Sequence, residues 1–223
     1  IAPSARMVAE IAIGDPSASV ALLDSPEGRR LEASMPPAGR RALARWRGVW
    51  EPQQHGAFCA PASAVAALRF LGLPGAEGAT QWRVHDEVLV PHGLLTRGVS
   101  LAAGARLLRL LGFDVEERCL YDEATLAYAL REDLRQAFEL GSEQCLLVNY
   151  WRPSGGHWSP LAGCSDDHAL ILDTNDRRLP PHWVRVDALV RSLCARNRTT
   201  GRPRGYLVAR RPPPRAGSTC DDG

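Results

Sequence analysis

The sequence contains no lysine, and all 27 of its basic residues are arginine. Without a lysine amine, the chain cannot form a Schiff base with a substrate or use an amine side chain as a nucleophile. Any anion site must therefore rely on guanidinium groups, whose planar fork suits a carboxylate. The absence of lysine excludes one class of covalent catalysis and leaves the others open.

A strong charge of either sign is also missing, because the 27 basic residues face 25 acidic ones and the formal net charge is only +2. Such a balance does not indicate binding to nucleic acid or to a membrane surface. No apolar run approaches the roughly 18 to 20 residues that a membrane span requires. We therefore expect no nucleic-acid partner, no membrane partner and a cytoplasmic location. A removed leader before Ile1 and a homodimer both stay open.

Cysteine motifs for zinc or for redox chemistry are lacking as well. The six cysteines form no CxxC pair and no zinc-ligand spacing, and a chain of 223 residues does not need disulfides to be stable. Reduced thiols and no metal site are the expectation. The six are Cys59, Cys119, Cys145, Cys164, Cys194 and Cys220.

The order of the hydrophobic patterns predicts an α+β fold, with helices first and a mostly antiparallel sheet later. Helical spacing begins at Cys59, after Ser100 and after Asp122, and the first two stretches stop at Gly72 and Gly112. Short apolar runs separated by turn residues predict the strands, with one helix after Asp187 inserted before the last of them. The predicted strands span residues 145–151, 157–164, 168–173 and 204–210, and residues 113–117 are expected to be extended.

Composition divides the chain into three parts. Residues 1–40 mix Pro, Ser, Gly and Ala and are expected to be a loosely ordered lead-in. Residues 41–212 form the expected main domain, and residues 213–223 form a Pro-rich and then polar tail. One well-cored domain is the prediction.

Cys59 is the first candidate for chemistry, because it lies where a polar stretch, "EPQQHGAF", runs into a helical pattern. A cysteine at a helix start receives unpaired amides and the positive end of the helix dipole, which stabilise a thiolate. The alternative is a small buried apolar residue, which position alone favours. A nucleophile also needs a base nearby.

His157 and Asp173 are the best candidates for the base and its partner. His157 follows "PSGG" and opens one strand, while Asp173 ends the next one. In a hairpin that turns at "SDD", the start of the first strand lies beside the end of the second, so the two side chains should be neighbours. Taken singly, His157 could be a surface turn residue and Asp173 a strand cap.

An acyl-transfer site also needs a donor for the developing oxyanion, and a side-chain amide just upstream of the nucleophile can provide it. Gln53 and Gln54 both fit, and spacing alone does not choose between them. The chain order Gln, Cys, His, Asp is typical of papain-like thiol enzymes.

These residues lie in stretches that resemble the phytochelatin synthases, which are glutathione γ-glutamylcysteinyltransferases with a papain-like catalytic domain. The matching stretches are "EPQQHGAFCAPAS", "GVSLAAGARLLRLLG", "VNYWRPSGGHWSPLAG", "ILDTNDRRLPPHWV" and "RPRGYLV", within a likeness over residues 20–212. The resemblance implies an N-terminal helical lobe that carries the nucleophile helix and a C-terminal sheet that carries His157 and Asp173. It also implies Cys59 as nucleophile, His157 as base and acid, Asp173 as its partner, and Gln53 as oxyanion donor.

The resemblance further implies that Arg204 holds the γ-glutamyl carboxylate and counts Gly156 with the substrate-binding residues. Two positions depart from the family pattern. Asp176 stands where the family usually has arginine, and Asn197 stands where an acidic residue normally meets the substrate ammonium. Both changes concern substrate handling rather than the triad.

The implied activity is cleavage of glutathione through an acyl-enzyme, with glutathione as donor and acceptor and with hydrolysis outrunning chain extension. No cofactor is expected for acylation, and cadmium or zinc would enter as a glutathione thiolate complex. Two alternatives stay open. One is a papain-like amidase with another substrate, and the other is a non-catalytic domain in which Cys59, His157 and Asp173 ligate a metal.

Overall fold

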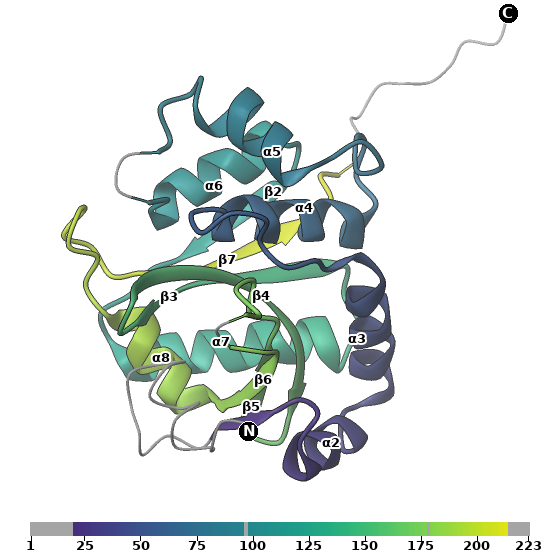
Figure 1. Ribbon diagram of the computed structural model, residues 1–223. Coiled ribbons are helices and arrows are strands. Elements are labelled where there is room, and N and C mark those ends of the chain that lie inside the picture. The colour runs from purple at the N-terminus through teal and green to yellow at the C-terminus, as the bar shows by residue number, and fades with distance from the viewer. Residues whose placement is uncertain (1–19, 96–97, 178, 214–223) are drawn as a thin grey trace, which may run out of the picture.

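The computed structural model describes residues 20–95, 98–177 and 179–213, which form a seven-stranded antiparallel sheet covered by helices on both faces (Figure 1). The strand order is β1-β6-β5-β4-β3-β7-β2, and each neighbouring pair is antiparallel. The strands are β1 (Val20–Leu22), β2 (Asp114–Arg118), β3 (Gln144–Arg152), β4 (Gly155–Ser165), β5 (His168–Ile171), β6 (His182–Arg185) and β7 (Gly205–Arg210).

The helices cover the sheet in two groups. One group, with α3, α4 and α6, shares a core with Leu147 and Leu207, whereas α7 and α8 share a core with Leu146 and Val148 on the opposite face. The helices are α2 (Pro26–Ala33), α3 (Pro37–Val49), α4 (Cys59–Leu71), α5 (Gln81–Arg83), the π-helix η1 (Val84–Leu89), α6 (Leu101–Leu110), α7 (Glu123–Phe138) and α8 (Val186–Cys194). Successive side chains of β3 pack into opposite cores because strand side chains alternate between the two faces of the sheet.

The three helices predicted from sequence are confirmed, together with their caps. Helix α4 ends at Gly72, which adopts the left-handed conformation with φ of 58°. Helix α6 begins after Ser100, whose hydroxyl accepts from the amide of Ala103 at 3.2 Å. Helix α7 begins after Asp122, whose carboxylate accepts from the amide of Thr125 at 2.7 Å.

The predicted sheet is also confirmed, and its strands differ from the predicted ranges mainly at their ends. The residues of "FDVEE" from Asp114 onward lie in β2, and α8 precedes β7 as expected. The strand expected over residues 168–173 stops at Ile171, so Asp173 lies just beyond the end of β5. Strand β6 was not predicted as a strand.

The prediction that residues 1–40 form a loosely ordered lead-in is wrong for residues 20–40. This segment contains β1, α2 and the start of α3, and Leu31 and Met35 are almost completely buried. Its short helices bury few residues each, so the polar composition concealed them. Residues 1–19 lie outside the described residues, as does the tail from residue 214 on.

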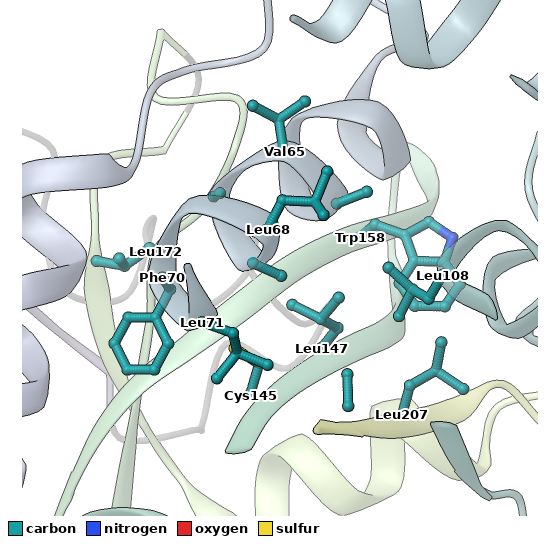
Figure 2. Packing of buried hydrophobic residues seen from close by; sticks show 14 of the residues in the cluster. Val65, Leu68, Phe70, Leu71, Leu108, Cys145, Leu147, Trp158, Leu172 and Leu207 are labelled. Carbon is teal, nitrogen blue, oxygen red and sulfur yellow. The ribbon is translucent and has the colours of Figure 1, made fainter. Parts of the chain in front are cut away.

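Helix α4 is the central helix of the N-terminal half, and nearly all of its residues are buried. Figure 2 shows Leu68 and Leu71 of α4 close to Leu147 of β3, with Leu207 of β7 on the same side. This packing fixes the start of α4, and therefore Cys59, relative to β3 and β4. Within the described residues, no helix combines the length and apolar character needed to cross a membrane.

Candidate active site

Cys59 is the first residue of α4 and lies in a cleft of about 500 Å³. The cleft is lined by residues before α4, by the loop that leads into α6, by the hairpin between β3 and β4, and by the loop before β7. The Cys59 side chain is half-buried. The first amides of a helix have no partner within the helix, so the thiol lies where local polarity favours negative charge.

His157 lies in the same cleft on β4, and its ring Nε2 is 2.9 Å from Oδ1 of Asp173. The hairpin of β4 and β5 brings the two residues together, because the chain continues from β5 alongside the start of β4. The amide of Leu172 donates to the carbonyl of Pro160 at 3.1 Å, which extends the pairing up to Asp173. The contact expected from the hairpin argument is therefore present.

Asp173 is completely buried and fully hydrogen-bonded. Its Oδ2 accepts from the Tyr150 hydroxyl at 2.9 Å and from Nη1 of Arg152 at 2.7 Å. Its Oδ1 accepts from the amide of Asn175 at 2.8 Å in addition to His157. Tyr150 and Arg152 are two residues apart on β3, so both side chains leave the same face of the strand. These contacts fix the carboxylate in one orientation.

The electrostatics of the cleft favour a thiolate and imidazolium pair. Burial disfavours the Cys59 thiolate, but a hydrogen bond and charge from His157, the backbone of Trp158 and the charge of Arg152 outweigh it and lower the pKa of the Cys59 thiol. Burial disfavours the His157 cation, but Asp173 and Cys59 outweigh it and raise the pKa of the imidazole. Burial likewise opposes the Asp173 anion, yet His157 and Arg152 hold the pKa of that carboxyl well below its usual range.

The other four described cysteines differ from Cys59, because burial raises the pKa of each thiol. The pKa of Cys164 rises to about 12 and that of Cys194 to about 11, and the pKa values of Cys119 and Cys145 are also raised. Cys220 lies outside the described residues. The described chain contains no group of three or more His, Cys, Asp or Glu side chains placed to hold a metal ion.

Gln53 lies close to the triad, whereas the Gln54 side chain is exposed. The Gln53 amide nitrogen donates to the carbonyls of His55 and Gly56 at 3.0 and 3.1 Å, in the loop before Cys59. Its Oε1 accepts from the Thr174 hydroxyl at 3.2 Å. In this geometry Gln53 holds the loop, and donation to an oxyanion would require it to exchange one of the two loop bonds.

Arg204 is buried against the cleft wall, where only 7% of it is exposed. Its Nη1 donates to Oδ1 of Asn149 at 3.2 Å, while its Nε has no partner among the described residues. A side chain at Gly156 would collide with the guanidinium, so this glycine allows the close approach. Burial alone lowers the pKa of Arg204. Both residues line the cleft that contains Cys59.

The two positions that depart from the family pattern differ in location. Asn197 lines the cleft, and its Oδ1 accepts from the amide of Thr199 at 2.9 Å. Asp176 is half-buried and is not among the described residues that line the cleft, whereas its neighbour Asn175 is. The Arg177 side chain is exposed, and Arg178 lies outside the described residues.

A family model described as phytochelatin synthase matches residues 17–206 of this chain. The chain belongs to the phytochelatin synthase family. This match covers α4, the β3 and β4 hairpin, Asp173 and Arg204, which together build the cleft.

Curated relatives of this family member carry the name glutathione gamma-glutamylcysteinyltransferase. The wheat (Triticum aestivum) enzyme 1 is 27% identical over 211 residues, which cover 88% of this chain and 41% of the relative. Enzyme 1 of Arabidopsis thaliana is 27% identical over 179 residues, covering 73% and 36% of the two chains. The Schizosaccharomyces pombe relative is 24% identical over 169 residues, which cover 70% of this chain and 40% of the relative. The chain thus spans about two fifths of the length of the curated relatives that it matches.

Two solved structures are more distant. The peptidase domain of Streptococcus ComA matches with a TM-score of 0.48 and 12% identity, covering 73% of this chain and 98% of that domain. The Pseudomonas avirulence protein AvrPphB matches with a TM-score of 0.37 and 14% identity, covering 70% of this chain and 90% of that protein.

Sequence reasoning missed two residues at the centre of this phytochelatin synthase family site. Arg152 forms the buried ion pair with Asp173, and Thr174 links the triad to the loop before Cys59. Arg152 stands at the end of an apolar strand, where an arginine is commonly solvated. The sequence did carry a signal for Arg152. Tyr150 is the residue that pairs with His157 across the hairpin, and Arg152, two positions later on the same strand, shares its face.

Proposed function

We propose that this protein cleaves glutathione at the bond between cysteine and glycine and passes the γ-Glu-Cys acyl group to water or to a second glutathione. One observation carries the proposal. A cysteine with a lowered pKa, a histidine fixed by a buried carboxylate and the buried guanidinium of Arg204 share one cleft. The first two supply acyl transfer, and the third can hold a carboxylate of the substrate.

In the proposed reaction the Cys59 thiolate attacks the carbonyl carbon of the substrate cysteine. The amide of Cys59 at the helix start and the Gln53 side chain are the proposed oxyanion donors. Because Nε2 of His157 faces Asp173, its Nδ1 is the nitrogen left for the reacting groups. From Nδ1 the imidazolium protonates the leaving glycine nitrogen, the amide bond breaks, and a thioester with Cys59 remains.

Deacylation reverses the roles. His157, now neutral, takes a proton from water or from the amine of a second glutathione as that nucleophile attacks the thioester. The products are γ-Glu-Cys in the first case and an extended peptide in the second, and the thiolate of Cys59 is regenerated. Acylation needs no cofactor in this scheme. Cadmium or zinc would enter as a thiolate complex of the substrate.

The activity is tested with purified protein and glutathione, with and without cadmium, and with products separated by mass. We expect glycine and γ-Glu-Cys in both samples, with extended peptide as the minor product. A Cys59→Ala sample serves as the control for background cleavage. Turnover of other amide substrates without any glycine release from glutathione would favour the papain-like amidase alternative.

A further inference from the structure

Two guanidinium groups flank one aromatic ring in the catalytic cleft. The guanidinium carbon of Arg204 lies 5.4 Å from the centroid of the Trp151 ring, and that of Arg198 lies 5.7 Å from the same centroid. All three side chains line the cleft together with Cys59 and His157. Stacking on an aromatic face orients a guanidinium while leaving its edge N–H groups free to donate.

Neither guanidinium is neutralised by the described part of the protein. Among the described residues, neither Arg198 nor Arg204 forms an ion pair, and none of the residues that line the cleft is Asp or Glu. Arg204 is more than nine-tenths buried, and its Nε has no hydrogen-bond partner among the described residues. A buried guanidinium without a counter-ion is costly, so a bound anion would stabilise this arrangement.

Two asparagine side-chain oxygens of the cleft each already accept one hydrogen bond. The Oδ1 atom of Asn149 already accepts from Arg204 at 3.2 Å, and Oδ1 of Asn197 already accepts from Thr199 at 2.9 Å. An ammonium group here would therefore meet two positive charges and no carboxylate. A carboxylate would meet unused N–H donors.

We propose that Arg198 and Arg204 form an anion-selective subsite that prefers an acyl donor whose end group carries a carboxylate without a neighbouring ammonium. A glutaryl group has this chemistry, whereas the γ-glutamyl group adds an ammonium beside its carboxylate. The inference rests on the proposed function, because it concerns which acyl group is presented to Cys59. In it, Arg204 holds the carboxylate and Arg198 disfavours the ammonium.

The test compares glutathione with glutaryl-cysteinylglycine, which differs from it only by the missing α-amino group. We expect kcat/KM, measured by glycine release at low salt, to be about three- to tenfold higher for the deaminated donor. The ratio of the two kcat/KM values should fall toward one as added salt screens the exposed charge of Arg198. Arg198→Gln should bring the ratio close to one, and Arg198→Glu should reverse the preference.

Arg202→Gln is the matched control. It removes the same charge from the same loop, but Arg202 lies outside the described lining of the cleft, so the donor ratio should stay as in the wild type. A wild-type preference for glutathione, or a ratio that Arg198→Gln leaves unchanged, would overturn the inference.

Failure of the proposed function would look different, because neither donor would then release glycine. The subsite can still be tested in that case by calorimetric titration of the Cys59→Ala protein with both donors. Tighter binding of the deaminated donor, lost in the double variant with Arg198→Gln, supports the subsite. Equal or weaker binding refutes it.

Discussion

His157 and Asp173 are joined by a hydrogen bond of 2.9 Å between Nε2 and Oδ1, which assigns the two ring nitrogens different tasks. The buried carboxylate only accepts, so Nε2 carries the proton and Nδ1 is left for the reacting groups of the proposed reaction. The orientation of the His157 ring is therefore fixed by a carboxylate that Arg152 and Tyr150 hold in turn.

The first prediction concerns pH. The thiolate of Cys59 is lost as pH falls through its lowered pKa, and the imidazolium of His157 is lost as pH rises through its raised pKa. We therefore expect a bell-shaped dependence of kcat/KM whose two limbs belong to the coupled pair. Iodoacetamide should modify Cys59 first, and His157→Ala should move that reactivity to higher pH. Faster modification of Cys119 or Cys145, with activity retained in Cys59→Ser, would contradict the assignment.

The second prediction concerns Arg152. Replacing it with glutamine leaves the buried Asp173 without its ion-pair partner, and we expect this to cost about 3 kcal/mol in the free energy of unfolding. Tyr150→Phe removes one neutral donor from the same carboxylate and should cost about 1 kcal/mol. Urea unfolding at neutral pH measures both, and equal losses would show that the Arg152 charge is unimportant.

The same pair predicts how stability depends on pH. The folded pKa of Asp173 is depressed, so its contribution is complete above the unfolded value of about 4 and is lost as pH falls toward the folded value. The stability difference between wild type and Arg152→Gln should therefore shrink below about pH 4. A difference that is constant down to the acid transition would mean that another group is responsible.

The third prediction concerns Thr174, whose hydroxyl lies 3.0 Å from the carbonyl of Trp158, 3.2 Å from Oε1 of Gln53 and 3.2 Å from Nε2 of His157. It connects His157 to the loop before Cys59. Thr174→Val keeps the shape but removes the hydroxyl, and we expect about a tenfold loss in kcat/KM, the equivalent of one lost hydrogen bond. Thr174→Ser should restore most of it. If Thr174 had a purely structural role, Thr174→Val would lower the stability of the protein without a selective loss of kcat/KM.

The sequence could predict the parts of this site that local patterns encode. The caps at Ser100 and Asp122, the glycine stop after α4 and the hairpin that joins His157 to Asp173 all follow from short-range signals. Arg152 was missed although its spacing from Tyr150 carried a signal, because its pairing with Asp173 depends on which face of β3 turns toward the end of β5. The packing of residues 20–40 was missed because α2 buries only Gly28 and Leu31 within a polar segment.

The fourth prediction separates the two substrate-handling positions. Asn197 lines the cleft, so Asn197→Asp should offer an ammonium a charged partner worth about 1 to 2 kcal/mol and lower the half-saturating glutathione concentration up to about tenfold. It should also raise the share of extended peptide. Asp176→Arg should add less, because Asp176 lies outside the described lining of the cleft. Efficient formation of long polymers by the wild type would contradict the expectation that extended peptide is the minor product.

The most direct test of the central claim is to trap the acyl-enzyme. The protein is mixed with excess glutathione, quenched in acid within seconds and measured by intact mass, with a peptide digest to locate the modification. We predict one γ-Glu-Cys acyl group on Cys59, released by hydroxylamine as a thioester and absent from Cys59→Ala. Glycine release by Cys59→Ala at the wild-type rate, or an acyl group on another residue, would contradict the account.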